Sequence, residues 1–114
     1  MKYIYKITSC DAWRDTETTG VFLGSGIDLS DRYIHFSTAQ QVEETAARHF
    51  SGLTDLLLIR VEASRLGSAL KWEISRGGEK FPHLYAPLML KDVDCVSPLK
   101  LRSDHRHDFS GLLK

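Results

Sequence analysis

The sequence predicts an α+β fold, with short strands and a few short helices packed in one domain. Three observations support this class: apolar and aromatic runs that alternate every second residue, one stretch with helical spacing, and glycines or prolines between them. The chain has 114 residues, within the usual range of about 100 to 150 for a single domain. We therefore expect residues 1–114 to form one domain.

The first elements are a strand and a short helix. Residues 2–7 are rich in Tyr and Ile, which favours a strand. Ser9 is a candidate N-cap, and it predicts a short helix that ends by Gly20. Residues 21–32 have no apolar periodicity, so they predict a loop with at most one helical turn, of a length that often borders a site.

A second strand carries the most informative polar side chains. Alternation sends Ile34 and Phe36 to the core and leaves the opposite face to Tyr33, His35 and Ser37. The pattern predicts one continuous strand with a polar face.

A helix is expected directly after this strand. Both Ser37-x-x-Gln40 and Thr38-x-x-Gln41 fit a capping box, and apolar residues follow at helical spacing until about Gly52. Free backbone N–H groups at such a helix start favour anions and polar ligands.

Three further strands are expected in the second half of the chain. Residues 56–61 are continuously apolar, which is typical of a central strand covered on both faces. Residues 71–75 alternate, which places Trp72 and Ile74 on one face and Glu73 on the other. Residues 93–96 predict another strand, which Leu99 and Leu101 extend if the pairing continues.

The chain end is charged and aperiodic, so residues 102–114 are expected to form a solvated tail. Its Asp-His-Arg-His-Asp run at 104–108 does not have the spacing of a zinc site, and we predict no metal.

Three residues in the second half of the chain add to the candidate site. His83 and Tyr85 lie two apart in a segment bounded by prolines, and they offer an imidazole and a phenol to a ligand. Glu73 can stabilise a cationic transition state or act as a base. The alternatives are that His35 is a half-buried histidine with satisfied hydrogen bonds and that Ser37 or Thr38 is only a cap. Glu73 would then be a surface strand glutamate, and the segment around His83 would only pack a turn through Phe81, Leu84 and Tyr85.

Bulk properties narrow the partners. Lys plus Arg and Asp plus Glu both number 15, so the net charge is zero and no broad surface for nucleic acid is expected. No apolar run approaches the roughly 20 residues that span a bilayer. We expect a cytoplasmic protein whose partner is a small molecule.

Taken together, three motifs resemble a small bacterial group, the domain of unknown function 952 family. They are IHFST at residues 34–38, WE at 72–73 and FPHLY at 81–85. That family is similar to compact ADP-ribosyltransferases, in which a split mixed β-sheet clasps nicotinamide adenine dinucleotide (NAD).

The resemblance also implies roles for individual residues. His35 would hold a ribose, Ser37 with Thr38 would support the nicotinamide side, and Glu73 would stabilise an oxocarbenium-like ribose. It implies an ADP-ribosyltransferase-like enzyme that uses NAD or a related ribose phosphate as substrate, with His35 and Glu73 catalytic and Ser37, Thr38, His83 and Tyr85 binding the ligand. The alternatives are a noncatalytic nucleotide or metabolite binding module and a structural or interaction domain.

Overall fold

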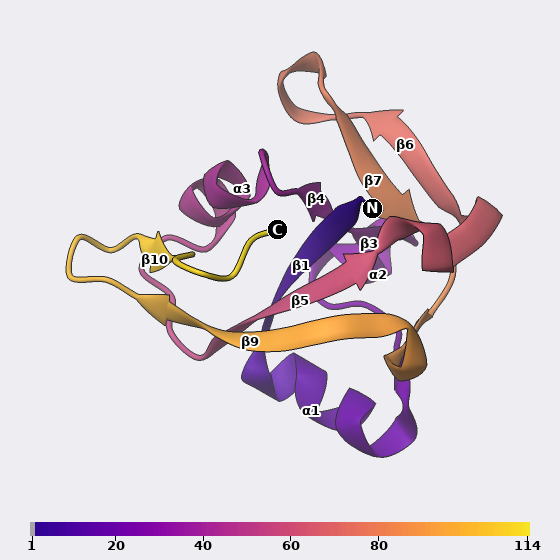
Figure 1. The fold of residues 1–114 in the computed structure, drawn as a ribbon, viewed down its shortest axis with the longest axis horizontal. Helices are drawn as coiled ribbons and strands as arrows, with labels where there is room; N and C mark the ends of the chain where they lie inside the picture. The colour runs from indigo at the N-terminus through magenta and orange to yellow at the C-terminus, as the bar shows by residue number, and fades with distance from the viewer. Residues whose placement is uncertain (1) are drawn as a thin grey trace.

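The computed structural model describes residues 2–114, and Figure 1 shows how their elements are arranged. The strands are β1 (Tyr3–Ser9), β2 (Val21–Phe22), β3 (Ile34–His35), β4 (Ser37–Thr38), β5 (Leu56–Glu62), β6 (Leu70–Ile74), β7 (Lys80–Leu84), β8 (Leu88–Met89), β9 (Val93–Leu101) and β10 (His107–Asp108). The helices are α1 (Cys10–Thr19), α2 (Ile27–Asp31) and α3 (Val42–His49), with 3-10 segments η1 (Ala63–Ala69), η2 (Arg76–Gly78) and η3 (Leu90–Asp92).

These strands form three sheets. The largest has the order β10-β9-β5-β1-β4, the second has the order β3-β7-β6, and β2 pairs with β8. The α+β class is confirmed. The prediction of a mixed sheet is wrong, because every pairing between the described strands is antiparallel.

Strand β5 lies between β9 and β1 in the large sheet and is covered on both faces, as its continuous apolar run predicts. Ile59 and Val61 pack into one buried cluster with Trp13. Leu56 and Leu58 pack into a second cluster on the other face. The two clusters fix the large sheet in the middle of the molecule (Figure 1).

The first helix follows its predicted caps. The Ser9 side chain accepts a hydrogen bond from the Ala12 N–H at 3.0 Å. Gly20 ends the helix with a φ of 80°, a conformation that glycine adopts without steric cost.

The predicted continuous strand over residues 33–37 is wrong, because it is split into β3 and β4, which belong to different sheets. Between them the Phe36 N–H donates to the Pro82 carbonyl at 3.0 Å. Ile34 pairs with β7, whereas Ser37 pairs with Tyr5 of β1. Ile34 and Phe36 are both buried, as alternation predicts. The break carries the chain from one sheet to the other.

The strand does not lead directly into a helix, because a turn at residues 39–41 separates β4 from α3. Half of the predicted Thr38-x-x-Gln41 capping box forms: the Gln41 side-chain oxygen accepts from the Thr38 N–H at 3.0 Å. The Gln41 amide nitrogen donates to the Lys80 carbonyl at 2.9 Å. One glutamine therefore ties the start of α3 to β7.

The prediction of a solvated tail over residues 102–114 is wrong for its central part. Strand β10 pairs with the end of β9, and Phe109 is buried in the cluster that contains Leu99. The His107 Nε2–H donates to the Leu53 carbonyl at 2.9 Å. Composition hid this element, because the apolar anchors follow a charged run. No helix in residues 2–114 has the length and apolar character needed to cross a membrane.

Candidate functional site

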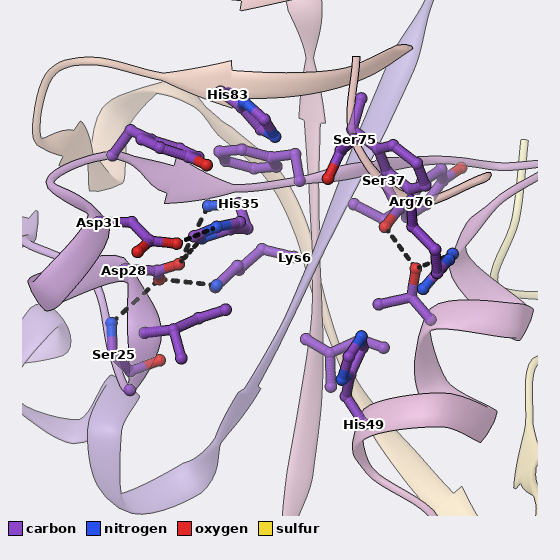
Figure 2. Close-up of a pocket in the computed structure, with 18 of the residues that line it drawn as sticks. Lys6, Ser25, Asp28, Asp31, His35, Ser37, His49, Ser75, Arg76 and His83 are labelled. Carbon is purple, nitrogen blue, oxygen red and sulfur yellow. Dashed lines mark hydrogen bonds and ion pairs between the residues drawn. The ribbon is translucent and has the colours of Figure 1, made fainter. Parts of the chain in front are cut away.

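A cavity of about 940 Å³ opens where the large sheet and the β3-β7-β6 sheet meet α2 and α3. Figure 2 shows its labelled residues in two groups, with Lys6, Asp28 and His35 on one side and Ser37, Arg76 and His49 on the other. Three of the predicted site residues line it, namely His35, Ser37 and His83. Its lining thus comes from segments far apart in the sequence.

Asp28 organises the first side of the cavity. Its side chain is completely buried and accepts four hydrogen bonds, from Ser25 N–H, Lys6 Nζ, His35 N–H and His35 Nδ1. The shortest are those from His35 Nδ1 at 2.6 Å and Lys6 Nζ at 2.7 Å. A buried carboxylate needs this many donors, because desolvation otherwise makes the charged form costly.

Protonation of this group follows from its contacts. Burial alone raises the pKa of Asp28, but the His35 hydrogen bond and the Lys6 charge outweigh it and lower that pKa to about 2. Burial lowers the pKa of Lys6, and the attraction of Asp28 opposes that change. Asp28 is therefore a fixed anion at neutral pH.

The loop before α2 closes tightly over Asp28. Gly24 has a φ of 110°, and a Cβ atom at this position would lie 2.7 Å from the Asp28 Cβ. Only glycine meets both conditions without strain.

His35 lies between two carboxylates. Its Nδ1 faces Asp28 at 2.6 Å, and its Nε2 faces Asp31 at 3.1 Å. Both nitrogens donate when the ring carries two protons. The Asp31 side chain is 44% exposed, so a ligand can replace it at Nε2 more easily than it can replace buried Asp28.

His83 belongs to a second histidine and carboxylate pair. Its Nδ1 contacts the Glu73 Oε1 at 2.8 Å, and the Tyr85 hydroxyl donates to the same oxygen at 2.7 Å. These two bonds, with Tyr85 the larger cause, lower the pKa of Glu73. The bond to Glu73 raises the pKa of Tyr85 to about 12. His83 and Tyr85 face the same way, as their spacing predicts.

Tyr33 joins the two pairs. Its ring centroid lies 4.4 Å from that of His35, 4.2 Å from that of His83 and 5.1 Å from that of Tyr85. These ring pairs are tilted, with interplanar angles of 39°, 32° and 35°, and rings packed this closely restrict one another's rotamers. The two imidazoles are therefore held in fixed positions, with centroids 5.4 Å apart.

Hydroxyl groups and Arg76 form the other side. Thr45 Oγ1 donates to the Gln41 carbonyl at 3.1 Å, and Arg76 Nη2 donates to Thr45 Oγ1 at 3.2 Å. Ser37 Oγ lies 2.9 Å from Thr45 Oγ1. Since the single Thr45 proton goes to Gln41, Ser37 is the donor in that contact. Ser37 thus belongs to a side-chain network and does not cap α3.

The remaining predicted residues do not line the cavity. Thr38 is held by the turn at Gln41, the Glu73 carboxylate is bound by His83 and Tyr85, and Tyr85 is 44% exposed. A direct contact of Glu73 with a ligand in this cavity is therefore not what the geometry favours.

Sequence reasoning missed several lining residues. Lys6 could have been identified from its position, because it is a lysine inside a strand whose neighbours Tyr5 and Ile7 are both core residues. Asp31 could have been identified from its spacing of four residues from His35, with which it pairs. No pattern in the sequence pointed to Arg76, which lies beside the Gly77-Gly78 turn. Within residues 2–114, no group of three or more His, Cys, Asp or Glu side chains is arranged to hold a metal ion.

Comparisons with known proteins place the chain in a family. The crystal structure of protein CC0527 from Caulobacter crescentus is 45% identical and superposes with a TM-score of 0.91, with 95% of each chain covered. A double methionine variant of CC0527 gives 44% identity and the same TM-score. The solution NMR structure of CC0527 gives a TM-score of 0.87 at 45% identity, covering 97% of this chain and 96% of that one.

No curated protein matches the chain. The model of the family described as "Protein of unknown function (DUF952)" matches residues 7–96, most of the chain. That stretch contains the three motifs at residues 34–38, 72–73 and 81–85. The chain therefore belongs to the DUF952 family.

Proposed function

We propose that the cavity binds the ribose of NAD or of a related ribose phosphate, and that the protein is an ADP-ribosyltransferase-like enzyme in fold and activity. One observation carries this proposal: His35 and His83, each with Nδ1 on a carboxylate, line one cavity. Its volume of about 940 Å³ is ample for a small-molecule site. The lining by two separate sheets fits the clasp that the family resemblance implies.

The chemistry proposed is cleavage of the bond between ribose C1 and its leaving group. The bonding electrons leave with nicotinamide, and positive charge develops on the ribose, which nearby carboxylates stabilise. Asp31 is the exposed carboxylate at the cavity. Water or another acceptor then adds to C1 and loses a proton.

We assign His83 as the base that accepts this proton from the water or other acceptor. Glu73 holds its Nδ1, which leaves Nε2 as the acceptor, the usual arrangement of a histidine oriented by a carboxylate. Glu73 is thus a positioning residue in this proposal. This role differs from the one that the family resemblance implies, in which Glu73 contacts the sugar directly.

A noncatalytic module that binds a nucleotide or small metabolite is the second candidate. One contact favours it: Asp31 occupies the Nε2 of His35, so this ring orients polar groups and has no free nitrogen for proton transfer. A sensor of this kind binds saturably and releases no product.

Ligand-observed NMR separates these candidates. NAD is incubated with the wild type, His35→Ala and His83→Gln, and nicotinamide release is followed over hours. The enzyme predicts binding by wild type, weakened binding by His35→Ala, and binding without release by His83→Gln. The control is His105→Asn, which changes an exposed histidine at a φ of 67° to a residue that tolerates this backbone. Saturable binding without release by wild type supports the module, and no binding by wild type removes NAD as the ligand for both candidates.

A further inference from the structure

We propose that Arg76 forms a phosphate subsite at the side of the cavity opposite Asp28, so that the ligand is a phosphorylated sugar with its phosphate at Arg76. This inference rests on the proposed function for the sugar and adds the specificity for phosphate. Figure 2 shows Arg76 across the cavity from Lys6, Asp28 and Asp31. A ribose phosphate would then extend from the carboxylates at one side to the guanidinium at the other.

Arg76 is fixed in place but largely unpaired. Its Nη2 donates to Thr45 Oγ1 at 3.2 Å, and its Cζ lies 5.0 Å from the centroid of the Phe81 ring. Its side chain is 20% exposed. Among the described residues, Nε and Nη1 have no acceptor within hydrogen-bond distance. A held guanidinium with free N–H groups is suited to a second, two-pronged acceptor.

The charges around Arg76 favour an anion. Arg48 supplies a second guanidinium to the lining of the cavity. Arg48 is already paired with Glu44 at 3.2 Å, whereas Arg76 is 3.8 Å from Glu44, beyond hydrogen-bond distance. Glu44 is therefore only a partial counterion for Arg76. A phosphate monoester, with nearly two negative charges, competes well with a single carboxylate for this guanidinium.

A serine hydroxyl next to Arg76 completes the subsite. The Ser37 hydroxyl is buried and already donates to Thr45, so the available donor is Ser75, which also lines the cavity. The Ser75 hydroxyl can donate to a phosphate oxygen after rotation about its Cβ. Arg76 supplies charge, and this serine supplies a neutral donor.

The test compares ligands that differ only in the phosphate. Binding of ribose 5-phosphate, ribose and inorganic phosphate is measured by NMR titration for wild type, Arg76→Met and Glu44→Gln. The control is Arg14→Met, which changes an exposed arginine on α1 that pairs with Asp11, three residues away on the same helix. Wild type should prefer ribose 5-phosphate to ribose by roughly ten- to a hundredfold, the effect of charge-assisted hydrogen bonds.

Arg76→Met should remove most of that preference and leave ribose binding unchanged. Glu44→Gln should strengthen ribose 5-phosphate binding several-fold, because it removes the competing carboxylate. A preference that persists in Arg76→Met overturns the subsite and leaves the proposed function standing. Phosphate binding that depends on Arg76, without any binding of ribose or NAD, supports the subsite and overturns the proposed function. No preference for ribose 5-phosphate in wild type also overturns the subsite.

Discussion

The two histidine and carboxylate pairs bury opposite partners. In the first pair the Asp28 carboxylate is fully buried and the His35 side chain is 25% exposed. In the second the His83 side chain is 4% exposed and the Glu73 carboxylate is 40% exposed. The difference indicates that Asp28 is part of the folded core, whereas Glu73 lies at the surface and orients the buried His83 ring through its Nδ1.

Removing the Asp28 charge should have the largest effect on stability. Asp28→Asn leaves Lys6 buried without its counterion, which should lower the free energy of unfolding by about 3 to 5 kcal/mol. Urea denaturation measures this change. The matched variant Asp31→Asn, at the exposed carboxylate of the same histidine, should cost less than about 1 kcal/mol. Equal losses in the two variants would contradict the assignment of Asp28 to the core.

The same carboxylate should make the protein sensitive to acid. The Asp28 pKa is about 2 in the fold, against an ordinary 3.8. Because it is depressed, its stabilisation is complete above the ordinary pKa and is lost as pH falls from about 5 towards 2. The loss should be about 2 kcal/mol. Lys6→Met with Asp28→Asn, a neutral pair, serves as the control in urea unfolding at each pH. If both proteins lose stability in parallel, the sensitivity arises elsewhere.

Tyr33 couples the pairs, and its removal should have a smaller effect. Tyr33→Leu keeps an apolar side chain but loses the ring contacts with both histidines. We expect about 1 kcal/mol of lost stability, together with shifts of the ring-proton resonances of His35 and His83. Thermal unfolding and histidine-selective NMR measure these effects. A shift at one histidine alone would show that Tyr33 does not connect them.

The smallest expected effect is on the titration of Tyr85. The Glu73 hydrogen bond raises the pKa of Tyr85 to about 12, so Glu73→Gln should lower that pKa towards the ordinary 10.0. Absorbance of the phenolate during a pH titration reports the change, and Tyr85→Phe identifies which of the tyrosines is responsible. An unchanged Tyr85 titration in Glu73→Gln would show that the hydrogen bond to Glu73 does not cause the raised pKa.

Local patterns predicted much of the fold and some of the residues that line the cavity. Two-residue alternation identified the strand that carries Glu73 and sent Ile34 and Phe36 to the core, and the spacing of His83 and Tyr85 predicted their common direction. The pairing of Asp28 with Lys6 could not be predicted in this way, because it depends on the path of a glycine-containing loop. The break at Phe36 depends on a hydrogen bond to distant Pro82.

The prediction for the tail failed for a different reason. Its charged residues dominated the composition, although Phe109 and Leu112 supply the apolar contacts that fold it back. Burial there is decided by the partner surface on β5 and β9, which no local window of sequence contains.

The most direct test of one shared site is amide NMR of the labelled chain during titration with NAD. We expect the amides of His35, Ser37 and His83 to shift together with a single Kd, while residues 102–110 around the separate hollow near β10 do not shift. Shifts at only one of the histidines, or a response confined to residues 102–110, would contradict the claim that both pairs serve one small-molecule site.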